Sequence, residues 1–422
     1  MKTRATGLIV VLVGAALGMF FASFSTYDFA EHLDRQTHDL HCSFIPGIAG
    51  RPEAAGTGCH VTLMSPYSSV MRSSVWGGVP VSMPAMSVFA FIAFWAIYLM
   101  ITKRNGDRRG TMFLLLATAL PLITSLVMGF ISFTKLGAAC KLCIGIYVSS
   151  LVVFVGAMMA RSASAKLQAA RGTGGPADET VPADVYDPRM DKPISFPALA
   201  GAFVLGIAFV FVPVVVYAST LPNYERYIGQ CGALEHQGDP QGIMVSIDPG
   251  SPGATEAIEV LDPLCPSCKA FEQRLQASGL APRLSRKAVL FPLDNTCNWM
   301  LSRAEHPGAC TVSEAVLCAG DNAREVLDWA FAEQDRIREA ASHDPAAATR
   351  LVRERFPQLS SCIGTAAIRN KLSRSLRWAV NNHLQVLTPQ LFVGGVKLCD
   401  EDSDLGMDYA LSHMLERRGG AR

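Results

Sequence analysis

Long apolar segments give the chain its first pattern. Five of them run from Thr6 to Phe24, from Val79 to Thr102, from Thr111 to Phe133, from Ala139 to Ala160 and from Phe196 to Ala218. An α-helix needs about 20 apolar residues to cross a bilayer, and each segment is close to that length. The pattern therefore predicts an α-helical membrane protein, with a four-helix transmembrane bundle followed by a fifth transmembrane helix.

The basic residues between these segments predict the orientation of the chain. They are Lys2 and Arg4 before the first segment, Lys103, Arg104, Arg108 and Arg109 between the second and the third, and Arg161, Lys166 and Arg171 after the fourth. Short loops rich in Lys and Arg face the cytoplasm. We therefore expect a multi-pass protein of the cell inner (cytoplasmic) membrane, with a cytoplasmic N-terminus and a periplasmic, extracytoplasmic C-terminal domain.

A secretory signal is the alternative reading of the first segment, because basic residues precede its apolar run. That run is longer than a signal core, and it lacks a clear small-x-small cleavage site. We therefore expect a retained helix.

The C-terminal part has the mixed pattern of a globular α/β domain. We expect strands at residues 242–247, 255–261, 287–293 and 390–393, helices at 269–278 and 403–416, and a helical block at 312–383. The predicted organisation is a four-helix transmembrane domain at residues 1–160, a cytoplasmic linker at 161–195, the fifth transmembrane helix at 196–218 and an extracytoplasmic domain at 224–422.

The composition agrees with a membrane protein, since 50% of the residues are hydrophobic and only 17% are charged. The formal net charge of +1 gives no sign of a nucleic-acid partner. Twelve cysteines are unusual in a reducing cytosol unless they bind metal or do redox work. The predicted orientation places all of them outside the cytoplasm or at the outer membrane edge.

Cys265 and Cys268 form a Cys-x-x-Cys pair between a predicted strand and a predicted helix. The N-terminus of a helix stabilises a thiolate through its backbone N–H groups and its dipole. We therefore expect Cys265 to be the nucleophile and Cys268 the thiol that resolves a mixed disulfide. A static disulfide and half of a zinc site are the alternatives, but no second Cys-x-x-Cys or His-x-x-His lies nearby in this domain.

Thr388-Pro389 lies far downstream, just before a predicted strand. Together with the strand before Cys-Pro-Ser-Cys and the helical block, it resembles the DsbA type of disulfide oxidoreductase over most of residues 240–418. The resemblance implies a thioredoxin-like domain with a helical insertion, in which Thr388 and Pro389 form a cis-proline loop that binds substrate.

Cys140 and Cys143 form a second Cys-x-x-Cys pair, at the start of the fourth apolar segment. A polar, reactive pair at the membrane edge is costly unless it has a function. A lipid-soluble quinone is the natural oxidant at this place, because it accepts two electrons and a dithiol donates two.

The residues around this pair resemble the vitamin K epoxide reductase family over about residues 6–160. The matching motifs are Cys140-x-x-Cys143-Ile144-x-x-Tyr147, Cys59 with Ser65 and Tyr67, and Gly78-Val79-Pro80-Val81. Bacterial members of that family are often fused, through a fifth helix, to a thioredoxin-like domain, and the predicted domains have the same order.

The resemblance also implies a role for each matching residue. Cys143 would face the quinone, and Cys140 would exchange electrons with Cys59. Cys42 would be the loop thiol that meets Cys265. Ser65 and Tyr147 would line the site of the quinone head group, which would be ubiquinone or menaquinone.

Two further sets of residues have simpler readings. His38, His41, Cys42, Cys59 and His60 include metal-ligand types, but loop histidines are more often only solvated, and we expect no metal. Six more cysteines are candidates for structural disulfides, namely Cys231, Cys297, Cys310, Cys318, Cys362 and Cys399. Fifteen pairings are possible, and a bridge across the short stretch from Cys297 to Cys310 is the easiest to expect. An additional shuttle pair is the alternative.

The expected function is a quinone-dependent thiol oxidase. Reduced extracytoplasmic proteins would pass electrons to Cys265 and Cys268, then to Cys42 and Cys59, then to Cys140 and Cys143, and finally to a membrane quinone. The partners are thus membrane lipid, a quinone and folding substrate proteins. The alternatives are an outward reductive relay or disulfide isomerase, and a membrane-tethered binding module with a thioredoxin fold.

Overall fold

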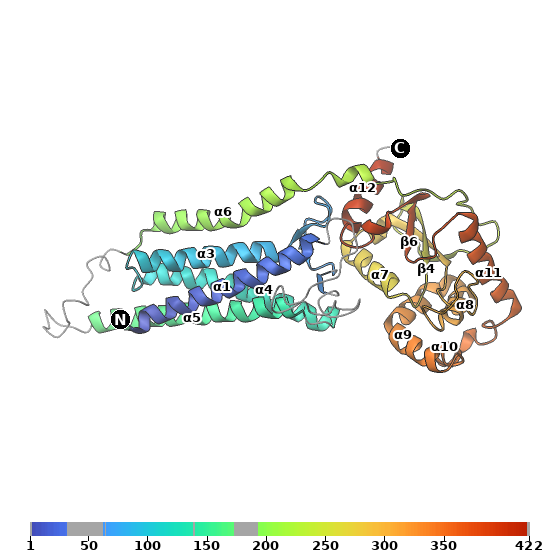
Figure 1. Ribbon diagram of the computed structural model, residues 1–422, viewed down its shortest axis with the longest axis horizontal. Coiled ribbons are helices and arrows are strands. Elements are labelled where there is room, and N and C mark those ends of the chain that lie inside the picture. The colour runs from blue at the N-terminus through green and yellow to red at the C-terminus, as the bar shows by residue number, and fades with distance from the viewer. Residues whose placement is uncertain (1, 32–61, 64, 138–139, 173–192, 420–422) are drawn as a thin grey trace. The chain divides into compact units, whose positions relative to one another are not determined.

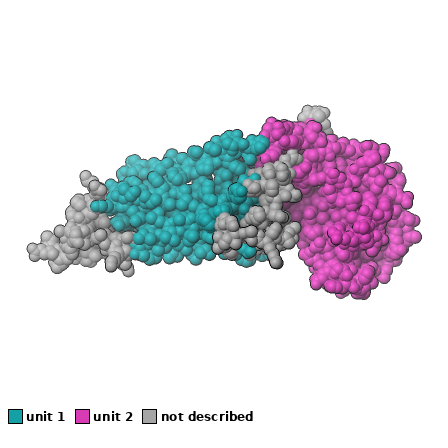
Figure 2. Space-filling view, viewed as in Figure 1, with its two compact units in different colours: residues 1–71, 79–222 teal, residues 72–78, 223–422 magenta. Residues whose placement is uncertain are grey.

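The computed structural model describes residues 2–31, 62–63, 65–137, 140–172 and 193–419. The chain divides into two compact units (Figure 2). The first unit consists of residues 1–71 and 79–222, and the second consists of residues 72–78 and 223–422.

Long apolar helices make up the first unit. Its elements are α1 (Lys2–Glu31), the paired strands β1 (Ser69–Val70) and β2 (Val79–Pro80), α3 (Ser82–Ile101), α4 (Arg108–Ile131), the π-helix η2 (Ser132–Leu136), α5 (Lys141–Gly172) and α6 (Phe196–Thr220). Helix α1 packs against α3 and α5, α4 packs against α3 and α5, and α6 packs against α3 (Figure 1). Among the described residues, five helical segments are long and apolar enough to cross a membrane. The first unit is therefore a helical domain compatible with a multi-pass membrane protein.

Glycines allow α1 and α5 to approach each other closely. A Cβ atom added at Gly156 would lie 2.8 Å from the backbone nitrogen of Val11, and one added at Gly7 would lie 2.6 Å from the backbone nitrogen of Ala160. Helices in lipid gain little from the hydrophobic effect, so close van der Waals contact at small residues is a main source of their packing energy. This contact holds α5 along α1.

Helix α5, which corresponds to the fourth apolar segment, is longer than the sequence predicted. We expected the helix to end at Ala160 and a linker to begin at residue 161, but α5 continues to Gly172. The added residues are rich in Ala and also include Lys, Leu and Gln, all of which favour helix. Residues 173–192 of the predicted linker lie outside the described residues.

A mixed sheet forms the centre of the second unit. Its strands are β3 (Val245–Asp248), β4 (Thr255–Leu261), β5 (Leu284–Leu290), β6 (Gln390–Val393) and β7 (Val396–Lys397), in the spatial order β3-β5-β4-β6-β7. Strands β4 and β5 are parallel, and the other neighbours are antiparallel. The second unit is thus mainly a C-terminal mixed α/β domain.

Two strands lie three residues or fewer away from their predicted bounds. The strand expected at residues 242–247 is β3, at residues 245–248, and the strand expected at 287–293 is β5, at 284–290. β5 ends before Pro292, which has no N–H to donate to a sheet. Its earlier start allows Leu284 to pair with Thr255 at the beginning of β4.

Helices cover both faces of this sheet. They are α7 (Pro266–Ser278), α8 (Ala309–Ala319), α9 (Ala323–His343), α10 (Ala347–Arg355), α11 (Ala366–Asn381) and α12 (Met407–Gly419), with short 3-10 turns η5 (Tyr224–Tyr227), η6 (Ala281–Arg283), η7 (Gly320–Asn322), η8 (Pro357–Leu359) and η9 (Asp400–Asp402). Apolar residues of α7 and α12 pack with Ala257 of β4, whereas those of α11 pack with Val260 of the same strand. Helices α8 to α11 form the predicted helical block beside the sheet (Figure 1).

A buried ionic cluster joins the strands of the sheet to α7. Arg286 of β5 is fully buried, and its guanidinium lies 3.0 Å from Glu259 and 2.6 Å from Glu272. Asp248 lies 3.4 Å away, and Arg324 of α9 contacts Glu272 at 2.8 Å. A buried guanidinium is tolerated only with such partners, so this cluster ties β4, β5 and α7 together.

Residues Arg72–Gly78 belong to the second unit, although the sequence predicted them within the domain of residues 1–160. Trp76 is buried there, stacks on Tyr224 with ring centroids 4.2 Å apart, and donates a hydrogen bond of 2.9 Å to Asp402. Arg72 forms an ion pair of 3.0 Å with Asp408. All these partners lie far away in sequence, so no local pattern could predict the assignment.

Candidate functional site

The Cys140–Cys143 pair lies at the beginning of α5. Helix α5 starts at Lys141, so Cys140 directly precedes it and Cys143 lies in its first turn. The backbone N–H of Cys143 donates to the Cys140 sulfur at 3.4 Å. Cys140 is buried and Cys143 is half-buried. The three-residue spacing thus places two thiols side by side, where they can form a disulfide.

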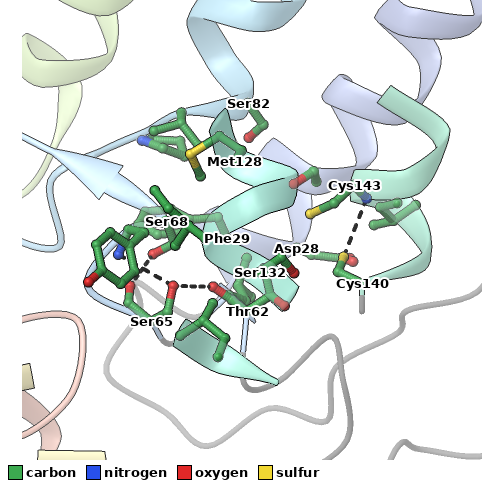
Figure 3. Close-up of a pocket in the computed structure, with 18 of the residues that line it drawn as sticks. Asp28, Phe29, Thr62, Ser65, Ser68, Ser82, Met128, Ser132, Cys140 and Cys143 are labelled. Atoms are coloured by element: carbon green, nitrogen blue, oxygen red, sulfur yellow. Dashed lines mark hydrogen bonds between the residues drawn. The ribbon is translucent and has the colours of Figure 1, made fainter. Parts of the chain in front are cut away.

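Both thiols line a cavity in the first unit (Figure 3). The other lining residues are Ser25, Asp28 and Phe29 of α1, Thr62, Leu63, Ser65, Tyr67 and Ser68 of the following segment, Pro80, Val81 and Ser82 at the start of α3, Met128, Ile131, Ser132 and Leu136 at the end of α4 and in η2, and Leu142 and Tyr147 of α5. The structure therefore brings Cys140, Cys143, Ser65 and Tyr147, which the sequence singled out, into one cavity.

Tyr147 and Ser65 approach the cavity from different elements. Tyr147 lies four residues after Cys143, which places both on one face of α5. The hydroxyl of Ser65 donates to the carbonyl oxygen of Thr62 at 2.7 Å and accepts from the backbone N–H of Tyr67 at 3.3 Å (Figure 3). Ser65 thus already has partners within its own segment, and its hydroxyl would have to rotate to donate to a ligand.

Sequence reasoning missed Asp28 as a residue of this cavity. Asp28 lies near the end of α1, and its side chain is half-buried (Figure 3). A carboxylate near the end of a long apolar helix is itself a signal of function. That signal could have been read from the sequence, but only the fold shows that Asp28 shares a cavity with the thiols.

The second dithiol lies in the second unit, at the beginning of α7. Cys265 directly precedes the helix, and Cys268 is in the first turn, with no exposed surface. The hydrogen bond with Cys268 lowers the pKa of the Cys265 thiol to about 6, although burial acts in the opposite direction. Burial raises the pKa of Cys268 well above its usual value, and the hydrogen bond with Cys265 adds to this rise. At neutral pH, Cys265 is therefore a thiolate and Cys268 a thiol, which fits the expected nucleophile and resolving residue.

Thr388 and Pro389 lie next to this dithiol. The Thr388–Pro389 peptide bond is cis, and the Cys265 thiol lies 3.5 Å from the carbonyl oxygen of Thr388. The two parts of the site are far apart in sequence, and the neighbouring strands β4 and β6 bring them together.

The six other cysteines of the second unit form three disulfides. The pairs are Cys231–Cys399, Cys297–Cys310 and Cys318–Cys362. They include the expected bridge between Cys297 and Cys310. Cys42 and Cys59, with the loop histidines His38, His41 and His60, lie outside the described residues, so their predicted roles stay predictions.

Comparisons with known proteins bear on the first unit. No curated protein matches the chain. A family model does match it, and the matched residues contain α3, α4, the cavity and the Cys140–Cys143 pair. Over residues 9–158 the chain is similar to the Vitamin K epoxide reductase family, whose members are oxidoreductases.

Proposed function

We propose that the protein is a quinone-dependent thiol oxidase that forms disulfides in extracytoplasmic proteins. One observation carries the proposal: Cys140, Cys143, Ser65 and Tyr147 line a single cavity among apolar helices. The family match over the same residues supports redox work by this pair.

The lining of the cavity suits a quinone head group. Phe29, Leu136 and Leu142 offer apolar surface to a ring, and the hydroxyl groups of Ser65 and Tyr147 could donate hydrogen bonds to its two oxygens. A bound quinone supplies an acceptor for two electrons and two protons. The dithiol of Cys140 and Cys143 loses the same two electrons and two protons when its sulfur–sulfur bond forms, so the exchange balances.

The second dithiol would collect electrons from substrate proteins. We propose that the second unit is a thioredoxin-like domain, on the strength of its strand order and of Cys-x-x-Cys at the start of α7. A substrate thiolate would attack the oxidised pair at Cys265, and Cys268 would leave as a thiolate. A second substrate thiolate would then release Cys265, so the substrate gains a disulfide and the pair gains two electrons.

Cys42 and Cys59 would connect the two dithiols. This part of the proposal depends on the family resemblance alone. Each step of such a relay exchanges one disulfide for another, so no proton or electron is left over.

A reductive relay in the opposite direction is the second candidate. It would need a thiol on the cytoplasmic side to receive electrons, and the predicted orientation places no cysteine there. A binding module without redox work would have no use for a Cys265 thiol whose pKa lies at about 6.

Thiol trapping in living cells tests the proposed direction of flow. We expect Cys140→Ser to block the last step, so that Cys265 and Cys268 accumulate as thiols. Quenching the cells with acid stops thiol exchange, and alkylation after the precipitate is dissolved at neutral pH then labels these thiols. Ser150→Ala is the matched control on α5, because Ser150 bonds Ser125 and is not among the described residues that line the cavity. An oxidised Cys265–Cys268 pair in Cys140→Ser, at the level of the natural chain, would contradict the proposed flow.

A further inference from the structure

Asp262 and His306 form a buried pair beside the second dithiol. Asp262 has no exposed surface, and one of its carboxylate oxygens lies 2.7 Å from Nδ1 of His306. The same oxygen accepts from the backbone N–H of Leu293 at 2.7 Å, and the other accepts from Leu264 at 2.7 Å. The carboxylate of Asp262 therefore makes three hydrogen-bond contacts, with His306, Leu293 and Leu264.

His306 is held in place from its backbone as well as from its ring. The backbone N–H groups of Glu305 and His306 both donate to the carbonyl oxygen of Leu293 at 2.9 Å. His306 also lies within the loop that the Cys297–Cys310 disulfide closes. The His306 ring and the backbone N–H of Leu293 thus contact the same carboxylate oxygen of Asp262. Hydrogen bonds from both the ring and the backbone of His306 therefore fix its position.

Asp262 connects this pair to the nucleophile. It precedes Cys265 by three residues, and the backbone N–H of Cys265 donates to the carbonyl oxygen of Asp262 at 3.1 Å. Its carboxylate also lies close enough to raise the pKa of Cys265, although the hydrogen bond with Cys268, burial and the hydrogen bond with Thr388 have larger effects. An uncompensated carboxylate at this place would therefore work against a thiolate.

The charged groups around His306 favour its imidazolium form. Burial lowers the pKa of His306, but the hydrogen bond and the negative charge of Asp262, with a contribution from Cys265, raise it above the usual value. Arg338 acts in the opposite direction and does not cancel this rise.

We propose that His306 is a positioning residue for Cys265: Asp262 holds its imidazolium in place, and the imidazolium balances the carboxylate and stabilises the Cys265 thiolate. This inference rests on the proposed function, because a stabilised thiolate is useful to the protein only if Cys265 exchanges disulfides. The stabilised thiolate is the group that leaves when the second substrate thiolate releases the mixed disulfide. The exchange needs no proton from His306, so no proton transfer is added to it.

Reciprocity gives a test that needs no substitution. If the imidazolium stabilises the thiolate, reduction of the dithiol must stabilise the imidazolium by the same free energy. The pKa of His306 can be read from the pH profile of hydrogen–deuterium exchange at its C2 carbon, by mass spectrometry of the full chain in detergent. We expect a higher midpoint in the reduced protein than in the oxidised protein. Equal midpoints in the two forms would overturn the proposal.

His306→Gln gives the complementary test. Glutamine can still donate a hydrogen bond to Asp262 but carries no charge. We expect the midpoint of Cys265 alkylation by iodoacetamide to move about one pH value higher, which makes alkylation about tenfold slower below the midpoint. His383→Gln is the control, because His383 is 77% exposed and pairs only loosely with Glu235, at 3.8 Å.

The two variants separate a charge effect from a structural one. An unchanged alkylation midpoint in folded His306→Gln, with a thermal melting temperature close to that of the natural chain, would overturn the role of His306. Neither measurement involves a quinone. A failure of quinone reduction would therefore leave this inference standing, and a failure of this inference would leave the proposed function standing.

Discussion

The sulfur of Cys265 lies 3.5 Å from the carbonyl oxygen of Thr388. Cys265 follows β4 and Thr388 precedes β6, and these two strands are antiparallel neighbours in the sheet. The contact joins the beginning of α7 to the turn before β6. Cys265 is nearly buried, at 4% exposure, and Thr388 is one of the residues in contact with its sulfur. Under the proposed function, Thr388 would contact a polypeptide that forms a mixed disulfide with Cys265.

The pKa of Cys265 predicts how its reactivity depends on pH. A thiolate reacts and a thiol does not, so the alkylation rate of Cys265 should rise with pH and reach half its plateau near pH 6. Cys268→Ala removes the hydrogen bond that contributes most to the lowered pKa, and should move this midpoint upward. Alkylation rates from pH 4 to pH 9, followed by mass spectrometry of the Cys265 peptide, measure both values. A midpoint near pH 8.5 in the natural chain would show that the thiolate is not stabilised.

Tyr147→Phe tests the proposed quinone site. The substitution removes one hydroxyl and keeps the ring, so it should raise the KM for a short-chain quinone about fivefold, the value of one lost hydrogen bond. Tyr98→Phe is the control, because Tyr98 packs on Trp95 and is not among the described residues that line the cavity. Equal KM values for both variants would remove Tyr147 from the site.

Gly156→Ala should weaken the first unit. Its added Cβ would lie 2.8 Å from the backbone nitrogen of Val11, so α1 and α5 must move apart, at a cost of about 1–3 kcal/mol. Gly201→Ala on α6 is the control, since a Cβ there would have no atom within 4 Å. Thermal melting in detergent compares the two, and a melting temperature for Gly156→Ala as high as that for Gly201→Ala would argue against the close helix contact.

Arg286→Met should destabilise the second unit. The substitution leaves Glu259 and Glu272 buried without their cation, and such a loss costs about 3–5 kcal/mol. Arg324→Met is the milder control, because Arg324 is partly exposed and its substitution removes only one contact with Glu272. Pulse proteolysis in urea gives the free energy of unfolding for each. A loss for Arg286→Met no greater than that for Arg324→Met would mean that the buried cluster adds little stability.

Removal of a structural disulfide should affect stability but not electron flow. The Cys318–Cys362 bridge spans 44 residues, and its double alanine variant should lose about 2–4 kcal/mol. The same variant should still pass electrons from Cys265 to Cys140. Accumulation of a reduced Cys265–Cys268 pair in this variant would identify Cys318 and Cys362 as an additional shuttle pair.

Elements with a strong local pattern were predictable from the sequence. The strands at Thr255–Leu261 and Gln390–Val393 have the predicted bounds, because apolar residues and turn signals mark both ends. The ends of β5 and α5 were less predictable. The parallel pairing with Thr255 decides where β5 begins, and the helix propensity of the residues after Ala160 extends α5 beyond its apolar part.

The sites were predictable only where a motif is local. Both Cys-x-x-Cys pairs could be found from their spacing, and Ser65 and Tyr147 from a family resemblance. Asp28 and His306 lack such a motif. Asp28 shares a cavity with the thiols, and His306 meets Asp262, only after distant elements have packed. The pairing of the six disulfide cysteines could not be predicted for the same reason, since Cys231 and Cys399, for example, are 168 residues apart.

Anaerobic oxidation of the fully reduced protein by a quinone in detergent tests the central claim most directly. The account predicts one quinol for each disulfide formed, with loss of this reaction in Cys143→Ala and an unchanged rate in the Cys318→Ala/Cys362→Ala variant. Thiols of the natural chain that stay reduced in the presence of quinone, or a Cys143→Ala variant that is oxidised as fast, would contradict it.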